Sequence, residues 1–194
     1  RPRARATGDN TTRLSIKGDA DKNLAQYEEG TSITNEGKID LMGRPLALFV
    51  CFEGGDGSGK TTQARLLYRG LIQQGTAAVL VREPGYTAVG ERIRRLLHKG
   101  FMSPMTELLL FSAARAELVE QVIRPALNEG RVVITDRFAG STIAYQGYAR
   151  GLPLDKISAA NELATRGLSP HLTFLLDCNA ELALTRAHRR GSRS

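Results

Sequence analysis

Short apolar runs alternate with stretches of helical periodicity along most of the chain. Four of the runs are rich in β-branched and aromatic residues, which is typical of strands buried in a parallel sheet. These strands are predicted at 46–52, 77–81, 132–135 and 172–176. Helices are predicted at 61–75, 87–98, 104–129 (with a bend near Pro125), 141–148, 155–166 and 181–190. The alternation predicts right-handed crossovers and an α/β fold of three layers, a parallel sheet flanked by helices.

Residues 1–43 differ from the rest of the chain because they are polar and show no sustained periodicity. We expect a disordered or leader extension there, separate from a domain at 44–194. Met42 is a candidate start of the working protein. A transit peptide is less favoured, since such peptides are poor in acidic residues and this segment holds seven acidic against seven basic residues.

A glycine-rich turn lies between the first predicted strand and the first predicted helix. Residues 54–61 read G-x-x-x-x-G-K-T, the phosphate-binding loop of nucleotide-handling proteins. Its glycines let successive N–H groups point at phosphate oxygens, Lys60 can reach the β- and γ-phosphates, and the Thr61 hydroxyl can bind Mg²⁺. A chance Gly-Lys-Thr in a hairpin is the alternative, which the flanking strand and helix disfavour. The predicted ATP-binding residues are Gly54, Gly55, Asp56, Gly57, Ser58, Gly59, Lys60, Thr61 and Thr62.

Other polar loops are expected beside this turn, because doubly wound sheets bind ligands at the carboxyl ends of their strands. The loops at 82–86, 136–142 and from 177 onward follow strand ends in this way. Asp136 can hold Mg²⁺ or its waters, and Arg137 can bridge donor and acceptor phosphates. A surface ion pair is the alternative for these two residues.

Phe111 and Arg115 lie four residues apart and therefore on one helical face. The ring can stack on a base while the guanidinium hydrogen-bonds the acceptor edge of that base. On these residues alone, a core phenylalanine and a solvated arginine are an equally good interpretation.

Together these stretches resemble the bacterial type of the thymidylate kinase family, from about residue 46 to the C-terminus. The matching segments are FEGGDGSGKTT at 52–62, REPG at 82–85, GERIR at 90–94, LFSAAR at 110–115, DRF at 136–138 and AYQG at 144–147. The resemblance implies a P-loop kinase fold and transfer of the γ-phosphate of ATP to dTMP, with Mg²⁺, giving dTDP and ADP. Another nucleoside monophosphate kinase and a non-catalytic nucleotide-binding fragment remain as alternatives.

The resemblance also implies roles for individual residues. Phe111 would stack on thymine, Arg115 would bond its O4 side, and Tyr145 would lie beside the deoxyribose. The residues implied to bind dTMP are Glu83, Arg94, Phe111, Arg115, Arg137, Thr142, Tyr145 and Gln146. The residues implied to act in catalysis are Asp56, Lys60, Arg137, Arg186 and Arg190, and those implied to hold the metal are Thr61 and Asp136.

The residue after Asp56 indicates where a catalytic arginine is expected. Some members of the family carry an arginine at that point, and others supply it from a mobile lid. Because Gly57 follows Asp56 here, the lid is expected to supply it, with Arg186 and Arg190 on one helical face as candidates. A solvated basic helix end is the alternative.

Three features depart from the family pattern. Tyr86 stands where a second glycine is common, and Phe138 replaces a common tyrosine. The chain also ends at Ser194, within the lid. We therefore expect the fold to be truncated before its last strand, with one strand edge left bare.

The net charge of +7 makes nucleic acid a partner to consider. The basic excess lies around the predicted phosphate-binding loops and in the final tail, which fits small anionic ligands, and no basic stripe is interleaved with aromatic residues. No apolar run has the length of a membrane span. We therefore expect no nucleic acid and no membrane as partners, and a cytoplasmic location. A homodimer through the 104–129 helix is expected from the resemblance and from the apolar content of that helix.

Overall fold

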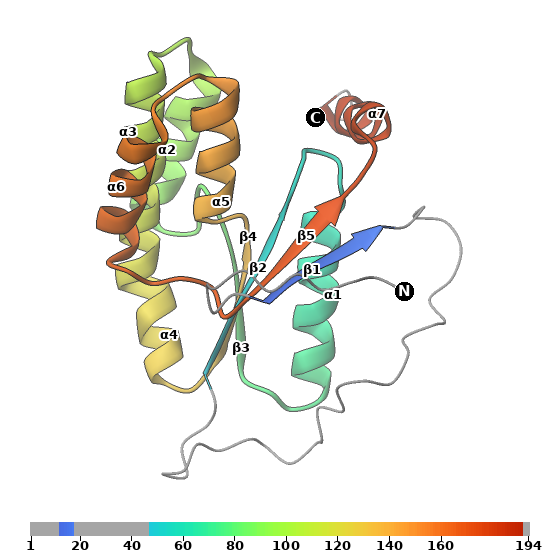
Figure 1. The fold of residues 1–194 in the computed structure, drawn as a ribbon. Helices are drawn as coiled ribbons and strands as arrows, with labels where there is room; N and C mark the ends of the chain where they lie inside the picture. Colours follow the sequence, from blue (N-terminus) through green and yellow to red (C-terminus); the bar gives the residue numbers. More distant parts are fainter. Residues whose placement is uncertain (1–11, 18–46, 192–194) are drawn as a thin grey trace.

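Five parallel strands form the centre of the computed structural model, which describes residues 12–17 and 47–191 (Figure 1). The strands are β1 (Thr12–Lys17), β2 (Leu48–Gly54), β3 (Ala78–Arg82), β4 (Val132–Asp136) and β5 (Leu172–Asp177). Their order across the sheet is β1-β5-β2-β4-β3, and every neighbouring pair is parallel. The four strands predicted from apolar runs are confirmed, and so is the parallel α/β sheet.

The sequence does not predict β1, which lies within the polar segment 1–43. This strand pairs with β5 along its whole length. It therefore covers one edge of β5. The expectation of a bare strand edge does not say which strand would carry it. The other residues of the segment, Met42 among them, lie outside the described residues, so the assignment of 1–43 as an extension stays a prediction.

Successive residues of the central strand β2 point to opposite faces of the sheet, and helices cover both faces. Phe49 and Cys51 belong to the core under α3 (Pro104–Leu118) and α4 (Arg124–Asn128). Val50 and Phe52 belong to the core under α1 (Lys60–Gln73). Figure 1 shows α1 on one side of the sheet and helices α2 to α6 on the other. Because both faces are buried there, the central strands β2 and β4 consist mostly of apolar residues and do not alternate with polar ones.

The helix predicted at 104–129 is divided in the structure. A π-helical segment, η1 (Val119–Ile123), separates α3 from α4. Pro125 lies in the first turn of α4 and has no N–H to offer the carbonyl of Gln121, so regular α-helical bonding cannot pass this point. The sequence predicts a bend near Pro125, and the structure has a π-helical segment that begins at Val119 and ends just before α4.

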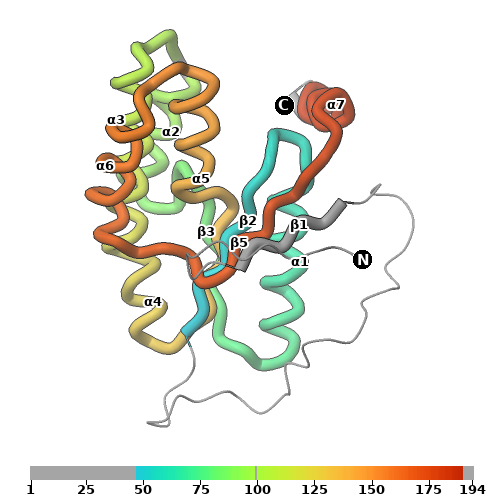
Figure 2. Tube along the Cα trace, viewed as in Figure 1, coloured from blue at the N-terminus to red at the C-terminus, as the bar shows by residue number. Residues whose placement is uncertain are grey.

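The other helices follow the predicted order. They are α2 (Ala88–Lys99), α5 (Ala139–Thr142), the π-helical η2 (Ile143–Ala149), α6 (Leu154–Thr165) and α7 (Ala180–Gly191). Thr87 caps α2 by accepting a hydrogen bond from the N–H of Gly90 at 2.9 Å. The helix predicted at 141–148 is α5 continued by η2 and begins two residues earlier. Figure 2 shows α7 at the carboxyl end of the sheet, beside the turn that joins β2 to α1.

Candidate active site

The turn between β2 and α1 has the backbone that a phosphate-binding loop requires. Gly54, Gly57 and Gly59 have φ angles of 145°, 84° and 101°, a region that side chains disfavour. Lys60 begins α1 and is buried, and its Nζ donates a hydrogen bond to the carbonyl of Gly55 at 2.7 Å. Burial lowers the pKa of the Lys60 ammonium. The remaining predicted members of the loop are Asp56 and Ser58 in the turn, and Thr61 and Thr62 in the first turn of α1.

Two oxygen ligands suited to Mg²⁺ meet at the end of β4. The Thr61 hydroxyl donates to Asp136 Oδ2 at 2.5 Å, which joins the first turn of α1 to the carboxyl end of β4. Among the described residues, no group of three or more His, Cys, Asp or Glu side chains could hold a metal ion. Mg²⁺ in phosphoryl-transfer sites is commonly held by one or two protein oxygens together with phosphates. The Thr61–Asp136 pair fits that kind of site.

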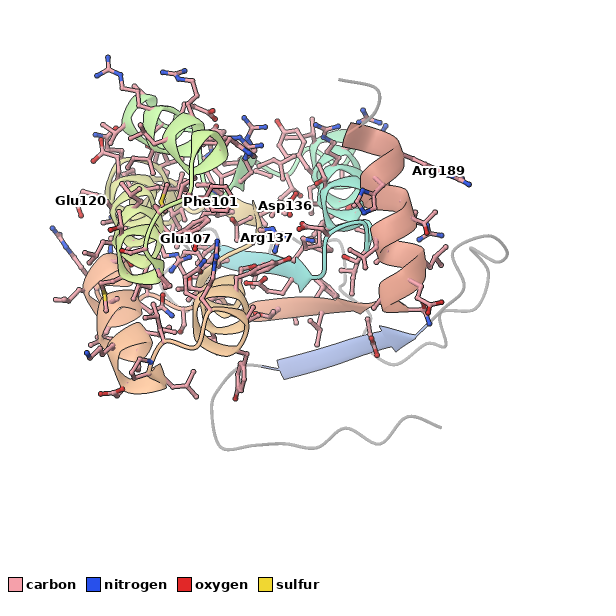
Figure 3. The ribbon with its side chains drawn as sticks, turned by 90° about the horizontal axis from the view of Figure 1, so that it is seen from above. Phe101, Glu107, Glu120, Asp136, Arg137 and Arg189 are labelled. Atoms are coloured by element: carbon pink, nitrogen blue, oxygen red, sulfur yellow. The ribbon has the colours of Figure 1, made fainter. Side chains whose placement is uncertain are left out.

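Arg137 follows Asp136 and reaches back to the glycine-rich loop. Its φ angle is 76°, in the left-handed region that arginine rarely adopts. The guanidinium forms an ion pair with Asp56 and donates to Ser141 Oγ at 3.0 Å. It also lies over the ring of Tyr145, 5.1 Å from the ring centroid. Figure 3 shows Asp136 and Arg137 side by side, between α7 and the helices on the other side of the sheet.

A cavity of about 440 Å³ joins the glycine-rich loop to the loop that follows β3. Residues of the first loop and α1 line one part, and residues 80–83, Tyr86 and α2 line another. Arg94 lines the cavity from α2 and donates to the carbonyl of Pro84 at 3.1 Å. The predicted site residues that line the cavity are Asp56, Gly57, Gly59, Lys60, Thr61, Glu83, Arg94, Asp136 and Arg137. The structure therefore brings the predicted donor and acceptor sides together.

Arg115 is 1% exposed and is held by acceptors from several elements. Its guanidinium donates to Glu83 Oε2 at 2.8 Å, Asn161 Oδ1 at 2.6 Å, Thr142 Oγ1 at 2.8 Å and the carbonyl of Phe138 at 3.2 Å. A guanidinium has five N–H groups, so these four contacts leave one N–H for a ligand. Burial raises the pKa of Glu83 to about 7, although the charge of Arg115 opposes the shift. The predicted solvated alternative for Arg115 is therefore wrong.

Among the other residues predicted to contact the nucleoside, Thr142 bonds to Arg115, and none of them lines the cavity described above. Phe111 is half-buried on α3, and Thr142 and Gln146 are buried. Tyr145 is partly exposed, and its hydroxyl donates to Asp56 Oδ2 at 3.3 Å. The roles of these residues in binding stay predictions.

Helix α7 packs directly against the glycine-rich loop. A Cβ atom at Gly57 would lie 1.9 Å from the carbonyl oxygen of Ala183, which is closer than two such atoms can approach. The absence of a side chain at Gly57 therefore allows this contact. Arg186 is half-buried on α7, whereas the side chain of Arg190 lies outside the described residues.

The two substitutions relative to the family pattern have different structural settings. Tyr86 has a φ angle of 72°, a conformation that favours glycine, which gives a physical reason for the glycine common at this point. Its N–H donates to Glu91 Oε1 at 2.9 Å. Phe138 is buried, packs edge-on against Phe49 with 5.1 Å between ring centroids, and lies under the Arg115 guanidinium. A phenylalanine without a hydroxyl suits that apolar position.

Three polar residues of the site are absent from the prediction. Ser141 accepts a hydrogen bond from Arg137, and Asn161 accepts one from Arg115. Glu53 accepts one from Ser141. Asn161 carried a usable signal, because it lies four residues from the buried Ile157 and so falls on the buried face of α6. The sequence also offered a signal for Glu53, because it is an acidic residue near the end of an otherwise apolar strand.

Comparisons with known proteins agree with this geometry. The thymidylate kinase family model matches residues 52–194. A thymidylate kinase from Synechococcus sp. is 55% identical over 144 residues, which cover 74% of this chain and 70% of that protein. A thymidylate kinase from Roseiflexus sp. is 51% identical over 152 residues, which cover 77% and 67% of the two chains. The crystal structure of thymidylate kinase from Ehrlichia chaffeensis matches with a TM-score of 0.66 at 40% identity, covering 77% of this chain and 86% of that one.

The fold and the site define a P-loop phosphotransferase, in which the phosphate loop and the arginine-bearing loops share one edge of a parallel sheet. The family model covers most of the chain, and the cited relatives are about half identical to it. The chain belongs to the thymidylate kinase family and is a kinase.

Proposed function

We propose that this chain transfers the γ-phosphate of ATP to dTMP and forms dTDP and ADP. The observation that carries the proposal is one cavity that is lined by the phosphate loop together with Glu83, Arg94 and Arg137. We propose that the donor and acceptor phosphates meet in that cavity. The names of the relatives identify dTMP as the acceptor of choice.

The reaction requires little covalent chemistry from the protein. An oxygen of the dTMP phosphate attacks the γ-phosphorus, the bond from that phosphorus to the β-phosphate oxygen breaks, and ADP leaves with the electron pair. Because the attacking oxygen is already anionic, no strong base is needed, and the rate depends on alignment and on neutralisation of charge. Lys60 would supply positive charge from the loop, and Arg137 would supply it from the end of β4.

We propose that Mg²⁺ is held by Thr61 and by Asp136, directly or through water. The support is their hydrogen bond, which fixes two hard oxygen atoms at the rim of the phosphate loop. When bound, the metal would neutralise charge on the β- and γ-phosphates.

For the nucleoside, we propose that Phe111 stacks on thymine while Arg115, Thr142 and Gln146 face its polar edge. Tyr145 would lie beside the deoxyribose and disfavour a 2′-hydroxyl. The bonding of Arg115 supports this proposal, because the four protein contacts give its remaining N–H one fixed direction.

Helix α7 is the proposed source of the lid arginine. Arg186 and Arg190 are the proposed residues, supported by the contact of α7 with the phosphate loop at Gly57. An arginine supplied to the γ-phosphate in this way contributes roughly 10³–10⁵ in rate in related phosphotransferases.

A homodimer through α3 is the proposed assembly, and a cytoplasmic location is proposed with it. Leu109 on α3 is 57% exposed, which gives this helix an apolar surface residue for a partner subunit. No helix of the described residues is long and apolar enough to cross a membrane.

A coupled assay that measures ADP formation with dTMP, dUMP, dCMP, AMP or GMP as acceptor tests the proposed reaction. We expect the highest kcat/KM with dTMP, and a Lys60→Met variant should lower kcat by roughly 10²–10³. A preference for any other monophosphate would identify a different kinase of the same fold. Binding of ATP with no ADP formed from any acceptor would identify a nucleotide-binding module instead.

A further inference from the structure

We propose that Glu53 is a positioning residue that holds the turn carrying Arg137 and ties it to the phosphate loop. This inference rests on the proposed function, in which Arg137 lies between the donor and acceptor phosphates. Glu53 is 8% exposed, and the hydrogen bonds that its carboxylate accepts come from Phe138 and Ser141, so we infer that it acts through these neighbours and not on the substrate.

The Glu53 carboxylate accepts three hydrogen bonds from the segment after β4. Its Oε1 accepts from the N–H of Phe138 at 3.0 Å and from the N–H of Ser141 at 3.1 Å. Its Oε2 accepts from the hydroxyl of Ser141 at 2.6 Å. These donors lie 85 and 88 residues further along the chain, so the contacts join two separate parts of the site.

Glu53 therefore caps α5 from outside the helix. Phe138 is the N-cap residue of α5, and its side chain makes no capping hydrogen bond. The Glu53 carboxylate accepts the N–H of Phe138 and shares the N–H of Ser141 with the carbonyl of Phe138, which lies 3.2 Å from that nitrogen. Its charge complements the positive end of the helix. A Cβ at Gly140 would lie 3.0 Å from Glu53 Oε1, so glycine leaves room for the carboxylate to approach.

Ser141 connects this cap to Arg137. Its hydroxyl hydrogen is donated to Glu53, which leaves the oxygen lone pairs free to accept from Arg137 Nη1 at 3.0 Å. The carboxylate thus fixes which way the serine hydroxyl points. A glutamine at position 53 would offer an N–H group in place of one acceptor oxygen, and so would compete with Arg137 for Ser141.

The backbone at Arg137 needs such support. Its φ angle of 76° is unfavourable for an arginine and persists only where the surroundings determine it. The N–H of Arg137 donates to the carbonyl of Phe52 at 3.0 Å, and the Thr135 hydroxyl donates to the carbonyl of Arg137 at 2.7 Å. Glu53 then holds Phe138 and Ser141, which follow Arg137 along the chain. Because Glu53 directly precedes Gly54, the phosphate loop and Arg137 share one anchor.

A double-mutant cycle in kcat tests the inference, with Glu53→Gln and Arg137→Ala made singly and together. If Glu53 acts through Arg137, Glu53→Gln should lower kcat roughly 10- to 100-fold in the native chain while the KM for ATP changes little, because misplaced alignment is costly. In the chain that already carries Arg137→Ala, Glu53→Gln should have a smaller effect. The fold-loss in kcat there should be at least about fivefold smaller than the fold-loss in the native chain. The inference would be overturned if Glu53→Gln lowered kcat by the same factor with and without Arg137→Ala. It would also be overturned if Glu53→Gln lowered kcat of the native chain less than about threefold.

Glu120→Gln is the matched control, because Glu120 is an exposed carboxylate that pairs with an exposed arginine, Arg166, at 2.8 Å. Its kcat should equal that of the native chain. If Glu53→Gln does not fold, as judged by circular dichroism, Ser141→Ala takes its place in the cycle, with the same fivefold criterion. A native chain that prefers another monophosphate would refute the proposed substrate only, and the cycle run with that acceptor would still decide the role of Glu53.

Discussion

The Arg115 guanidinium and the Glu83 carboxylate form an ion pair at 2.8 Å in which the two side chains are only 1% and 4% exposed. The pair joins α3 to the loop after β3, which lines the cavity. A buried pair of this kind costs much to desolvate, so its contribution depends on complete hydrogen bonding of both groups. Here Arg115 has four acceptors, whereas Glu83 Oε1 has no partner among the described residues.

Replacing Arg115 by leucine should lower the free energy of unfolding by about 3–5 kcal/mol, because it removes the buried donor on which the acceptor atoms of Glu83, Asn161 and Thr142 depend. Urea unfolding of the native and variant chains measures this change. The matched control is Arg166→Leu, which breaks the exposed pair with Glu120 and should cost less than about 1 kcal/mol. Equal losses for the two variants would show that burial of the Arg115 pair has no energetic consequence.

Glu83 should make stability fall with rising pH. Burial raises its pKa to about 7 in the folded chain, from an ordinary value of 4.5, so the folded state holds a proton that the unfolded state has lost. The stabilising contribution is therefore fully present below about pH 4.5 and is lost as the pH rises through 7.

Glu83→Gln is the variant that isolates this effect, since a glutamine does not titrate. Urea unfolding at several pH values should show that the stability of the native chain relative to this variant decreases between pH 4.5 and 7. A relative stability that rises with pH over the same interval would mean that Arg115 dominates and holds Glu83 ionised.

The sequence predicts the strands β2 to β5 and the phosphate loop because both depend on local signals, whereas it does not predict β1. The apolar run in β2 predicts a strand at the same residues, and the glycines of 54–59 predict the backbone conformation of the same turn. Glu53 and Asn161 depend instead on partners 46 to 88 residues away, and no spacing rule connects them to Arg115 or Arg137. The burial of Arg115 could not be predicted either. Its spacing of four residues from Phe111 defines a common helical face, but it does not show what packs against that face.

Asp136→Asn should weaken the dependence on Mg²⁺ that we propose for the site. An amide keeps the size of the side chain and removes its negative charge, so the Mg²⁺ concentration for half-maximal activity should rise roughly 10- to 100-fold. Activity measured against Mg²⁺ at constant ATP checks this. Asp155→Asn, at an exposed position in the first turn of α6, is the control and should leave the titration unchanged. A normal titration in the Asp136 variant would remove this residue from the metal site.

Leu109→Arg should weaken the proposed dimer. Leu109 on α3 is 57% exposed in one chain, and a charge placed at the centre of an interface should raise the dimer dissociation constant at least about tenfold. Sedimentation velocity over a range of concentrations measures the change. Leu66 on α1 is 53% exposed on the opposite face of the sheet, so Leu66→Arg is the matched control. Equal effects of both substitutions, or a native chain that sediments as a monomer, would exclude an interface through α3.

The contact between Gly57 and Ala183 makes two designs of this enzyme family mutually exclusive. A side chain at position 57 would collide with the backbone of α7, since even a Cβ would lie 1.9 Å from the Ala183 oxygen. An arginine introduced there would have to displace the helix that carries Arg186. The charge that we propose for Arg186 and an arginine at position 57 therefore cannot be present together in this chain while α7 stays in its place.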